Sequence, residues 1–291
     1  MNLLIAGDTV PVGDNISLFK KGDIETLLGE ALYEKWIEAD YRVFNLETPL
    51  YDGNTPISKC GPNLKAPTDT IQGLAKLKPT LVSLSNNHIL DHGSEGVYST
   101  LDQFKKHEIQ VIGVGDNLKE AHKPEIININ GQKIGFYSCA EHEFTIATET
   151  SPGANPFDPL ESLDHIRDLS QQVNYTIILL HGGKEHYRYP SPYLQKVCRK
   201  MVEKGADLVV CQHSHCIGCE ENYKNSKIVY GQGNFIFDYS DSDFWQTCLL
   251  INLDLDSFEI SYIPIEKQYE VIPESTDIAI MNDFLKRSQE I

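Results

Sequence analysis

The sequence has little positive charge for its size. Its 291 residues include 25 Lys and Arg against 42 Asp and Glu, which gives a formal net charge of −17 with histidine neutral. This excess of negative charge repels the phosphate backbone of nucleic acids and anionic membrane surfaces. We therefore expect no nucleic-acid partner. Because 41% of the residues are apolar, the composition is still that of a folded globular protein.

Long hydrophobic runs and a disulfide pattern are also missing. No apolar stretch approaches the roughly 20 residues that cross a bilayer, so we expect no membrane insertion. The amino terminus carries one short apolar run, at 3–6, whereas a signal peptide has an apolar core of about 7–15 residues. The seven cysteines are an odd number and lack the density of a disulfide framework. We therefore expect a cytoplasmic protein in a reducing compartment.

Short apolar runs alternate with helical patterns along the chain. The runs suit strands that are buried on both faces, and they lie at 3–6, 42–46, 80–85, 176–180 and 207–211. The spacing of apolar residues predicts helices at 66–77, 94–107 and 191–204. The pair Asn130-Gly131 predicts a β-hairpin. Strands that alternate with helices predict an α/β fold.

The chain has no internal repeat and no long linker, so we expect a single domain over 1–291. The segment 247–291 is expected to complete that domain with two strands, which turn at 254–257, and a helix near 276–287. The stretch 148–162 contains three prolines and a glycine. We expect it to form a surface loop beside the functional site.

Polar side chains follow five of the predicted strands. They are Asp8, Glu47, Asn87, His88, His181, His213 and His215. In open α/β sheets, ligands bind beyond the carboxyl ends of strands, so these side chains could converge on one site. Carboxylate, amide and imidazole groups suit Mn, Fe or Zn, and this set exceeds what one tetrahedral ion needs. The sequence therefore predicts a site for one or two divalent metal ions.

Most of these residues also have an ordinary structural interpretation. A single Asp after a strand is usually a turn or cap residue, and His88 could be a half-buried histidine. The pair His213 and His215 is more specific, because alternate residues of an extended backbone share one face. Cys216-Ile217-Gly218-Cys219 is a weak alternative signal for structural zinc.

Several ordered motifs resemble those of a known family. They are NLETPL at 45–50, NNHILDHG at 86–93, GVG at 113–115, HGGKEHY at 181–187 and GQGNFIFD at 231–238. Over about residues 2–240 they resemble the capsule-synthesis (poly-γ-glutamate biosynthesis) CapA family, within the calcineurin-like metallophosphoesterase superfamily. The resemblance implies a four-layer α/β/β/α sandwich, in which two mixed sheets are flanked by helices.

The resemblance also implies roles for individual residues. The implied metal ligands are Asp8 and His215 for one ion, Asn87, His181 and His213 for a second, and Glu47 as the bridge between them. A metal-bound hydroxide would attack a phosphoester or related anionic substrate, with His88 as general acid or transition-state stabiliser. The implied substrate-binding residues are Lys65, Glu185 and Asn234. Lys65 is equally compatible with an ordinary solvated lysine.

Two positions depart from the common superfamily pattern and match the capsule branch. Val10 stands where a histidine ligand is usual, and the bridging residue is Glu47 where Asp is usual. We therefore expect a metal-dependent hydrolase that acts on an anionic small molecule or polymer of capsule or poly-γ-glutamate metabolism. The alternative is a non-catalytic accessory protein, which would use the metal site to bind an anionic polymer or intermediate of capsule assembly.

Overall fold

A computed structural model describes residues 1–291 except 142, 239–241, 243, 267–269 and 272–273. Its larger sheet has the strand order β16 (Glu270–Val271), β15 (Ile260–Glu266), β14 (Thr247–Asp254), β1 (Asn2–Thr9), β2 (Tyr41–Leu46), β3 (Leu81–Ser83) and β4 (Val111–Ile112), with β13 (Asn234–Ile236) also paired to β1. The smaller sheet has the order β11 (Glu220–Tyr223), β12 (Ser226–Val229), β10 (Leu208–Gln212), β9 (Tyr175–His181), β7 (Gln132–Ala140) and β6 (Glu125–Ile129). A short pair joins β5 (Val114–Gly115) to β8 (Gly153–Ala154).

Both large sheets are mixed. The strands β1 to β4 pair in parallel, whereas β14 is antiparallel to β1. In the smaller sheet, β7, β9, β10 and β12 are parallel, and β6 and β11 pair antiparallel at the two edges. Parallel strands end at the same edge of a sheet, so residues that follow them can meet there.

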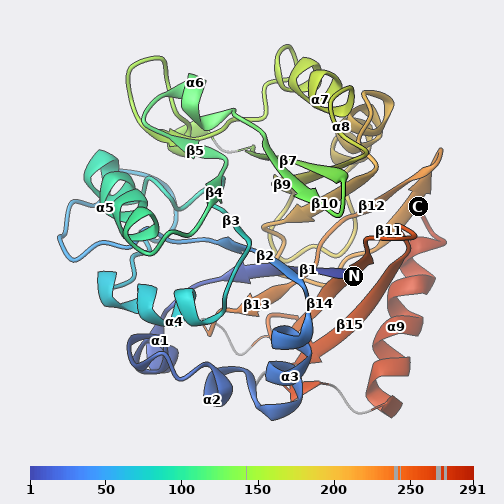
Figure 1. Cartoon of the computed structure of the whole chain (residues 1–291), viewed down its shortest axis with the longest axis horizontal. Helices are drawn as coiled ribbons and strands as arrows, with labels where there is room; N and C mark the ends of the chain where they lie inside the picture. The colour runs from blue at the N-terminus through green and yellow to red at the C-terminus, as the bar shows by residue number, and fades with distance from the viewer. Residues whose placement is uncertain (142, 239–241, 243, 267–269, 272–273) are drawn as a thin grey trace.

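Helices cover the outer faces of the sheets (Figure 1). The first group is α1 (Ile16–Lys21), α2 (Ile24–Leu28), α3 (Glu30–Glu38), α4 (Ile71–Lys76) and α5 (Gly93–Lys106), which contribute to a common core with the larger sheet. The second group is α7 (Ser162–Ser170) and α8 (Pro192–Glu203), which pack on the smaller sheet. The remaining helices are η1 (Gly13–Asn15), η2 (Thr68–Thr70), α6 (Leu118–Ala121), η3 (Glu143–Thr145) and α9 (Glu274–Ser288).

The strand residues alternate between two buried layers. On β1, Leu3 and Ile5 join the core between the sheets, whereas Leu4 joins the core beneath the first helix group. On β9, Ile177 joins the core between the sheets and Ile178 the core beneath α7 and α8. Successive side chains of a strand point to opposite faces, so an uninterrupted apolar run supplies both cores. This arrangement confirms the predicted four-layer α/β/β/α sandwich.

Most predicted elements are present with shifted boundaries. The three predicted helices are found as η2 with α4, α5 and α8, and the late helix is α9. The hairpin joins β6 to β7, and both turn residues, Asn130 and Gly131, have positive φ angles of 49° and 83°. The two late strands are β14 and β15, which pair antiparallel.

The expectation of a surface loop over 148–162 is wrong for its centre. Pro152, Ala154 and Asn155 are buried, and β8 pairs with β5. The Asn155 side chain donates a 2.7 Å hydrogen bond to the Ser138 carbonyl, and its own carbonyl accepts one from Ser85 Oγ. Prolines and a glycine indicated a turn, but these long-range hydrogen bonds draw the backbone into the interior.

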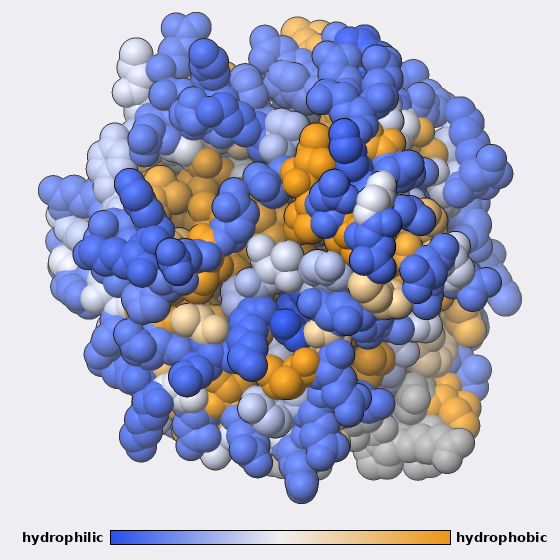
Figure 2. Space-filling model, viewed as in Figure 1, coloured by the Kyte–Doolittle hydropathy of each residue, from blue (hydrophilic) through white to orange (hydrophobic). Residues whose placement is uncertain are grey.

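One face of the molecule shows how polar and apolar residues are distributed on the surface. Figure 2 shows a mostly hydrophilic face, on which hydrophobic residues are visible mainly in recesses. Among the described residues, no helix is long and apolar enough to cross a membrane.

Candidate metal centre

The carboxyl ends of strands from both sheets meet at one buried site. Asp8 lies at the end of β1, Glu47 directly follows β2, and His181 is the last residue of β9. The distance from His181 Nε2 to Glu47 Oε1 is 3.3 Å, and His215 Nδ1 lies 3.4 Å from Asp8 Oδ2. All four side chains are buried. The structure therefore brings together residues that lie far apart in the sequence.

Within the described part of the chain, three overlapping groups have ligand atoms within 4.8 Å of one another. They are Asp8 with Glu47 and His215, Glu47 with His181 and His213, and Glu185 with His213 and His215. Glu47 belongs to two of these groups, which is the geometry expected of a carboxylate between two ions. The assignment of each residue to one ion stays a prediction.

The carboxylate of Glu47 lacks ordinary compensation. Both of its oxygens are buried, and among the described residues neither has a hydrogen-bond partner. Burial, together with the neighbouring charge of Asp8, raises the pKa of Glu47 well above its ordinary value. Burial also opposes ionisation of Asp8, but hydrogen bonding to His215 and the nearby imidazoles lower the pKa of Asp8. A buried carboxylate without donors is costly, so these residues fit a divalent cation.

Asn87 and His88 follow β3 and reach the same site. Asn87 Oδ1 lies 2.9 Å from His181 Nε2. His88 turns Nδ1 toward Asp91 Oδ2, at 2.6 Å, and Nε2 toward Glu47 Oε1, at 4.0 Å. Burial lowers the pKa of His88, although Asp91 opposes this effect. The ring therefore presents Nε2 to the candidate ligands.

The backbone at His213 and His215 differs from the sequence-based expectation. The strand β10 ends at Gln212, and the two histidines have φ angles of 89° and 54°. The premise of an extended backbone is therefore wrong, although both side chains do reach the site. His213 N donates a 3.3 Å hydrogen bond to Asp8 Oδ2, which ties this turn to β1. Non-glycine residues with positive φ are uncommon and concentrate at functional sites.

Two asparagine side chains form hydrogen bonds that orient the candidate ligands. Asn45 Nδ2 donates to Asp8 Oδ1 at 2.8 Å and lies 3.3 Å from His181 Nδ1. Asn86 Nδ2 donates in turn to Asn45 Oδ1, at 3.1 Å. Partners of this kind orient metal ligands and are often as important as the ligands themselves.

Position 10 is part of an apolar wall. Val10 is buried with Leu64, Phe237 and Trp245. The Trp245 ring lies over His215, with centroids 4.3 Å apart. The side chain that replaces the usual histidine ligand therefore packs beside the site and offers no ligand atom.

The three predicted substrate-binding residues occupy different environments. Glu185 is half exposed, and its Oε1 lies 3.8 Å from His213 Nε2. Asn234 is buried, and its Oδ1 lies 2.8 Å from His215 Nδ1, so it contacts a candidate ligand. Lys65 is exposed, and its Nζ donates to the Gly53 carbonyl. Substrate binding by these residues stays a prediction.

Sequence reasoning missed Lys59, Asp91 and Asn45 as parts of the site. Asp91 stands three positions after His88 within a quoted motif, and this spacing could have pointed to a hydrogen bond between them. Lys59 carries no such local signal, because it lies 29 positions before His88 in the sequence, in the loop 51–65.

The cysteines give no support to a structural zinc site. All seven are free, and six of them, including Cys216 and Cys219, are buried. Within the described part of the chain, the groups that could hold a metal ion contain no cysteine.

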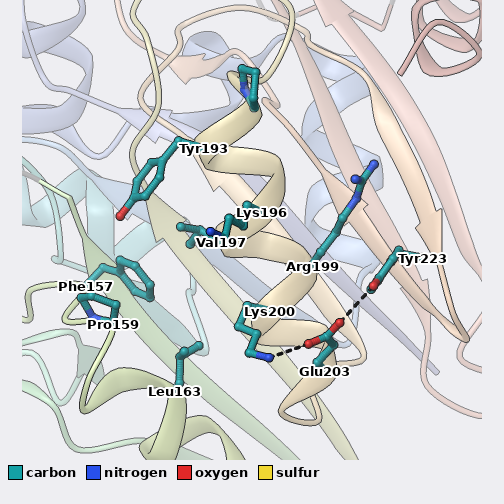
Figure 3. Close-up of a pocket in the computed structure, with 11 residues that line it drawn as sticks. Phe157, Pro159, Leu163, Tyr193, Lys196, Val197, Arg199, Lys200, Glu203 and Tyr223 are labelled. Carbon is teal, nitrogen blue, oxygen red and sulfur yellow. Dashed lines mark hydrogen bonds and ion pairs between the residues drawn. The ribbon is translucent and has the colours of Figure 1, made fainter.

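A separate groove of about 570 Å³ lies between α7 and α8 (Figure 3). Its apolar wall includes Phe157, Leu163 and Val197, and on its polar side Glu203 bonds to Lys200 and Tyr223. None of the candidate metal ligands lines this groove, so it is distinct from the metal centre.

Comparison with known proteins places these features in context. The profile of the family described as "Bacterial capsule synthesis protein PGA_cap" matches residues 2–239. The "Capsule biosynthesis protein CapA" of Bacillus anthracis is 29% identical over 209 residues, which cover 69% of this chain and 51% of that protein. The "PGA biosynthesis protein CapA" of Bacillus subtilis (strain 168) is 28% identical over 262 residues, which cover 86% of this chain and 66% of that protein. The chain thus spans about half to two thirds of the length of these relatives.

Solved structures share the fold at low sequence identity. A hypothetical protein from Thermus thermophilus superimposes with a TM-score of 0.59 at 14% identity, over 92% of this chain and all of that chain. A 5'-nucleotidase precursor from the same organism gives a TM-score of 0.50 at 16% identity, over all of this chain and 59% of that chain. These likenesses support the metallophosphoesterase-type fold and nothing about the substrate.

Proposed function

Because the chain belongs to the bacterial capsule synthesis (PGA_cap) family, we propose that it is a metal-dependent hydrolase of capsule or poly-γ-glutamate metabolism. The proposed substrate is a phosphoester or a related anionic small molecule or polymer. Mn, Fe and Zn are the proposed metals, because they accept mixed carboxylate and imidazole ligands. The proposed location is the cytoplasm.

The environment of Glu47 is the single observation that carries the proposal. A fully buried carboxylate, whose two oxygens accept no hydrogen bond from the described residues, lies beside Asp8 and three imidazoles. Packing alone does not account for this arrangement, because apolar residues of similar volume would avoid the desolvation cost. Two divalent cations would offset the carboxylate charges and leave a small cationic site for an anion.

The chain's own residues would divide the work as follows. Bound divalent ions supply Lewis acidity and lower the pKa of a coordinated water. The side chains of Asp8, Glu47, Asn87 and the three histidines would hold them. Asn45 fixes the orientation of Asp8, and Asn234 fixes that of His215.

His88 is the proposed proton donor to the leaving oxygen. Its Nδ1 is bonded to Asp91, so Nε2 is the nitrogen that faces the candidate ligands. When Nε2 is protonated as well, the imidazolium held in this way can give the Nε2 proton to the leaving oxygen and becomes neutral. Apolar and aromatic neighbours of the site, such as Trp245, would limit access of water.

Metal analysis combined with turnover tests the proposal. We expect purified protein to bind up to two equivalents of Mn²⁺ and to hydrolyse a generic aryl phosphate or a γ-glutamyl peptide. His88→Ala should keep the metal and lose turnover, whereas His107→Ala, at the end of α5, should change neither. Protein that binds no metal, or whose His213→Ala and His215→Ala variants bind Mn²⁺ as well as wild type, would contradict the proposal.

A non-catalytic accessory role is the second candidate, and Val10 favours it. Among the described His, Cys, Asp and Glu residues, the group around Asp8 and His215 has three members, and Val10 is buried in the apolar wall. An ion held by so few ligands could serve to grip an anionic polymer. Normal metal content without hydrolysis of any phosphoester or γ-glutamyl peptide, together with metal-dependent binding of poly-γ-glutamate, would select this role.

A further inference from the structure

A lysine is buried behind the proposed proton donor. Lys59 lies in the loop 51–65, and its side chain is 2% exposed. Its Nζ forms an ion pair with Asp91 Oδ1, lies 3.3 Å from the Asn87 carbonyl and 3.2 Å from His88 Nδ1, and is 5.2 Å from the centre of the Phe144 ring. Lysines are almost never buried to this extent unless they are paired.

Asp91 connects Lys59 to His88. Its side chain is fully buried, and its Oδ2 accepts hydrogen bonds from His88 Nδ1 and from the backbone nitrogen of Leu64, both at 2.6 Å. Its backbone carbonyl accepts a 3.0 Å hydrogen bond from Ile57 N. Three partners of Asp91, Lys59, Ile57 and Leu64, belong to the loop 51–65. This loop therefore fixes the position of Asp91, which in turn bonds to His88.

Stability does not explain a buried pair of this kind. Taking Lys59 and Asp91 out of water costs several kcal/mol per ion, and a packed apolar pair of similar volume is often at least as stable. The pair instead gives Asp91 a fixed charge and a fixed orientation. Without Lys59, Asp91 would be a third buried carboxylate near Asp8 and Glu47, and their repulsion would favour its displacement or protonation.

We infer that Lys59 is a positioning residue, which acts through Asp91 to hold the His88 ring with Nε2 directed at the metal centre. The inference rests on the proposed function of His88. The loop 51–65 therefore contributes to the site by positioning His88, although it contains none of the proposed metal ligands. Its contribution is to hold the proton donor in a near-attack position.

Turnover of Lys59→Met is the main test. This variant keeps the length of the side chain and removes its charge. We expect kcat to fall about 10- to 100-fold, with little change in KM or in metal content, as for other outer-sphere partners. Lys106→Met is the matched control, because Lys106 forms an ion pair with Asp102 on the surface. It should behave as wild type.

Two further variants separate positioning from folding. In a His88→Ala background, Lys59→Met should cause no additional loss, because its target is absent. The double variant Lys59→Met/Asp91→Asn leaves no unpaired buried charge and should therefore fold. It should remain as slow as Lys59→Met. Wild-type turnover in folded, metal-loaded Lys59→Met or in the double variant, or an equal further loss in the His88→Ala background, would overturn the inference.

A readout without substrate distinguishes this inference from the proposed function. In zinc-loaded protein, the buried Nδ1–H proton of His88 should give a downfield resonance, identified by its loss in His88→Ala. We expect Lys59→Met to shift and broaden this resonance, and Lys106→Met to leave it unchanged. If it changes as expected while wild type hydrolyses nothing, positioning stands and the hydrolase proposal fails. An unchanged resonance in Lys59→Met overturns the positioning inference, whatever the activity.

Discussion

The two sheets contribute chemically different halves to the candidate metal centre. The larger sheet supplies oxygen atoms from Asp8, Glu47 and Asn87, whereas the smaller sheet supplies nitrogen atoms from His181 and from the turn after β10. The oxygen half carries two buried carboxylates, but the imidazoles can be neutral. The need for a cation therefore lies mainly in the oxygen half, because its two carboxylates are buried, whereas Glu185, the carboxylate beside His213 in the second half, is half exposed.

The halves also differ in backbone conformation. Glu47 directly follows the parallel strand β2 and has no positive φ angle. His213 and His215 have positive φ angles on an irregular turn. The strand ends thus place the carboxylates without positive φ angles, whereas the histidines depend on a strained turn that tertiary contacts stabilise.

The largest expected effect is the loss of metal and turnover when Glu47, the proposed bridge between two ions, is replaced, compared with replacement of His181, a proposed ligand of one ion. Glu47→Gln should lose both metal ions and lower turnover by more than about 100-fold, because ligand loss exceeds the usual outer-sphere effect. His181→Ala should keep the ion that is assigned to Asp8 and His215. Metal content by mass spectrometry and aryl phosphate turnover measure this difference.

Glu34→Gln is a control for the loss of a carboxylate, since Glu34 is exposed. If Glu47→Gln and His181→Ala lost the same amount of metal, Glu47 would not bridge two ions and the proposed asymmetry would be incorrect.

Removal of metal is the next test, and its effect should be smaller. At a free metal concentration of about 100 times Kd, each site adds about 2.7 kcal/mol to the free energy of unfolding. Chelation of wild type should therefore lower the free energy of unfolding, since it leaves Glu47 and Asp8 buried without a cation. Urea unfolding with and without a chelator measures the difference.

In Glu47→Gln the same chelator should change stability little, because the bridging charge is gone and metal binding is already weak. A chelator response equal to that of wild type would show that the oxygen half does not create the metal requirement.

The contrast in backbone conformation predicts that the difference in stability between the Gly and Ala variants has opposite signs at positions 213 and 47. At position 213, the Gly variant should be more stable than the Ala variant by about 1 kcal/mol, because glycine tolerates positive φ. At position 47, the Gly variant should be less stable than the Ala variant by about 0.5–1 kcal/mol, through its greater unfolded-state freedom. Urea unfolding of the four metal-free variants gives both differences. The same sign at both positions would refute the contrast.

The smallest expected effect is the influence of the negative surface charge on the rate at which an anion reaches the site. The net charge of −17 repels an anion at a distance, although the metal-loaded site attracts it at contact. Added salt screens the repulsion, so the association rate of a fluorescent aryl phosphonate should rise a few-fold between low and physiological ionic strength. Stopped-flow mixing measures this rate, and chelation should abolish binding. A rate that falls with salt would indicate a cationic approach to the site.

Much of the fold could be predicted from local patterns. The apolar runs that became β1, β2, β9 and β10 are buried on both faces, and the spacing of apolar residues located α5 and α8 closely. The centre of 148–162 could not be predicted, because its burial depends on Asn155 and partners far away in the sequence.

The candidate ligands could be recognised because each follows a strand and has a metal-binding side chain. The predicted reason for the pairing of His213 with His215 was nevertheless wrong, since local spacing does not reveal a backbone of positive φ. The choice between two lysines of one loop was also beyond local reasoning. The family resemblance implies Lys65, whereas the structure places Lys59 against His88 and leaves Lys65 exposed.

The sequence by itself determined that buried strands alternate with helices, and it determined the kinds of atom available at the strand ends, because apolar patterns and side-chain chemistry are local properties. Only the tertiary structure decided which of these atoms meet, which backbone is strained and which lysine is buried with Asp91. The physical reason is that burial, and with it the cost of an uncompensated charge, depends on residues brought together by folding.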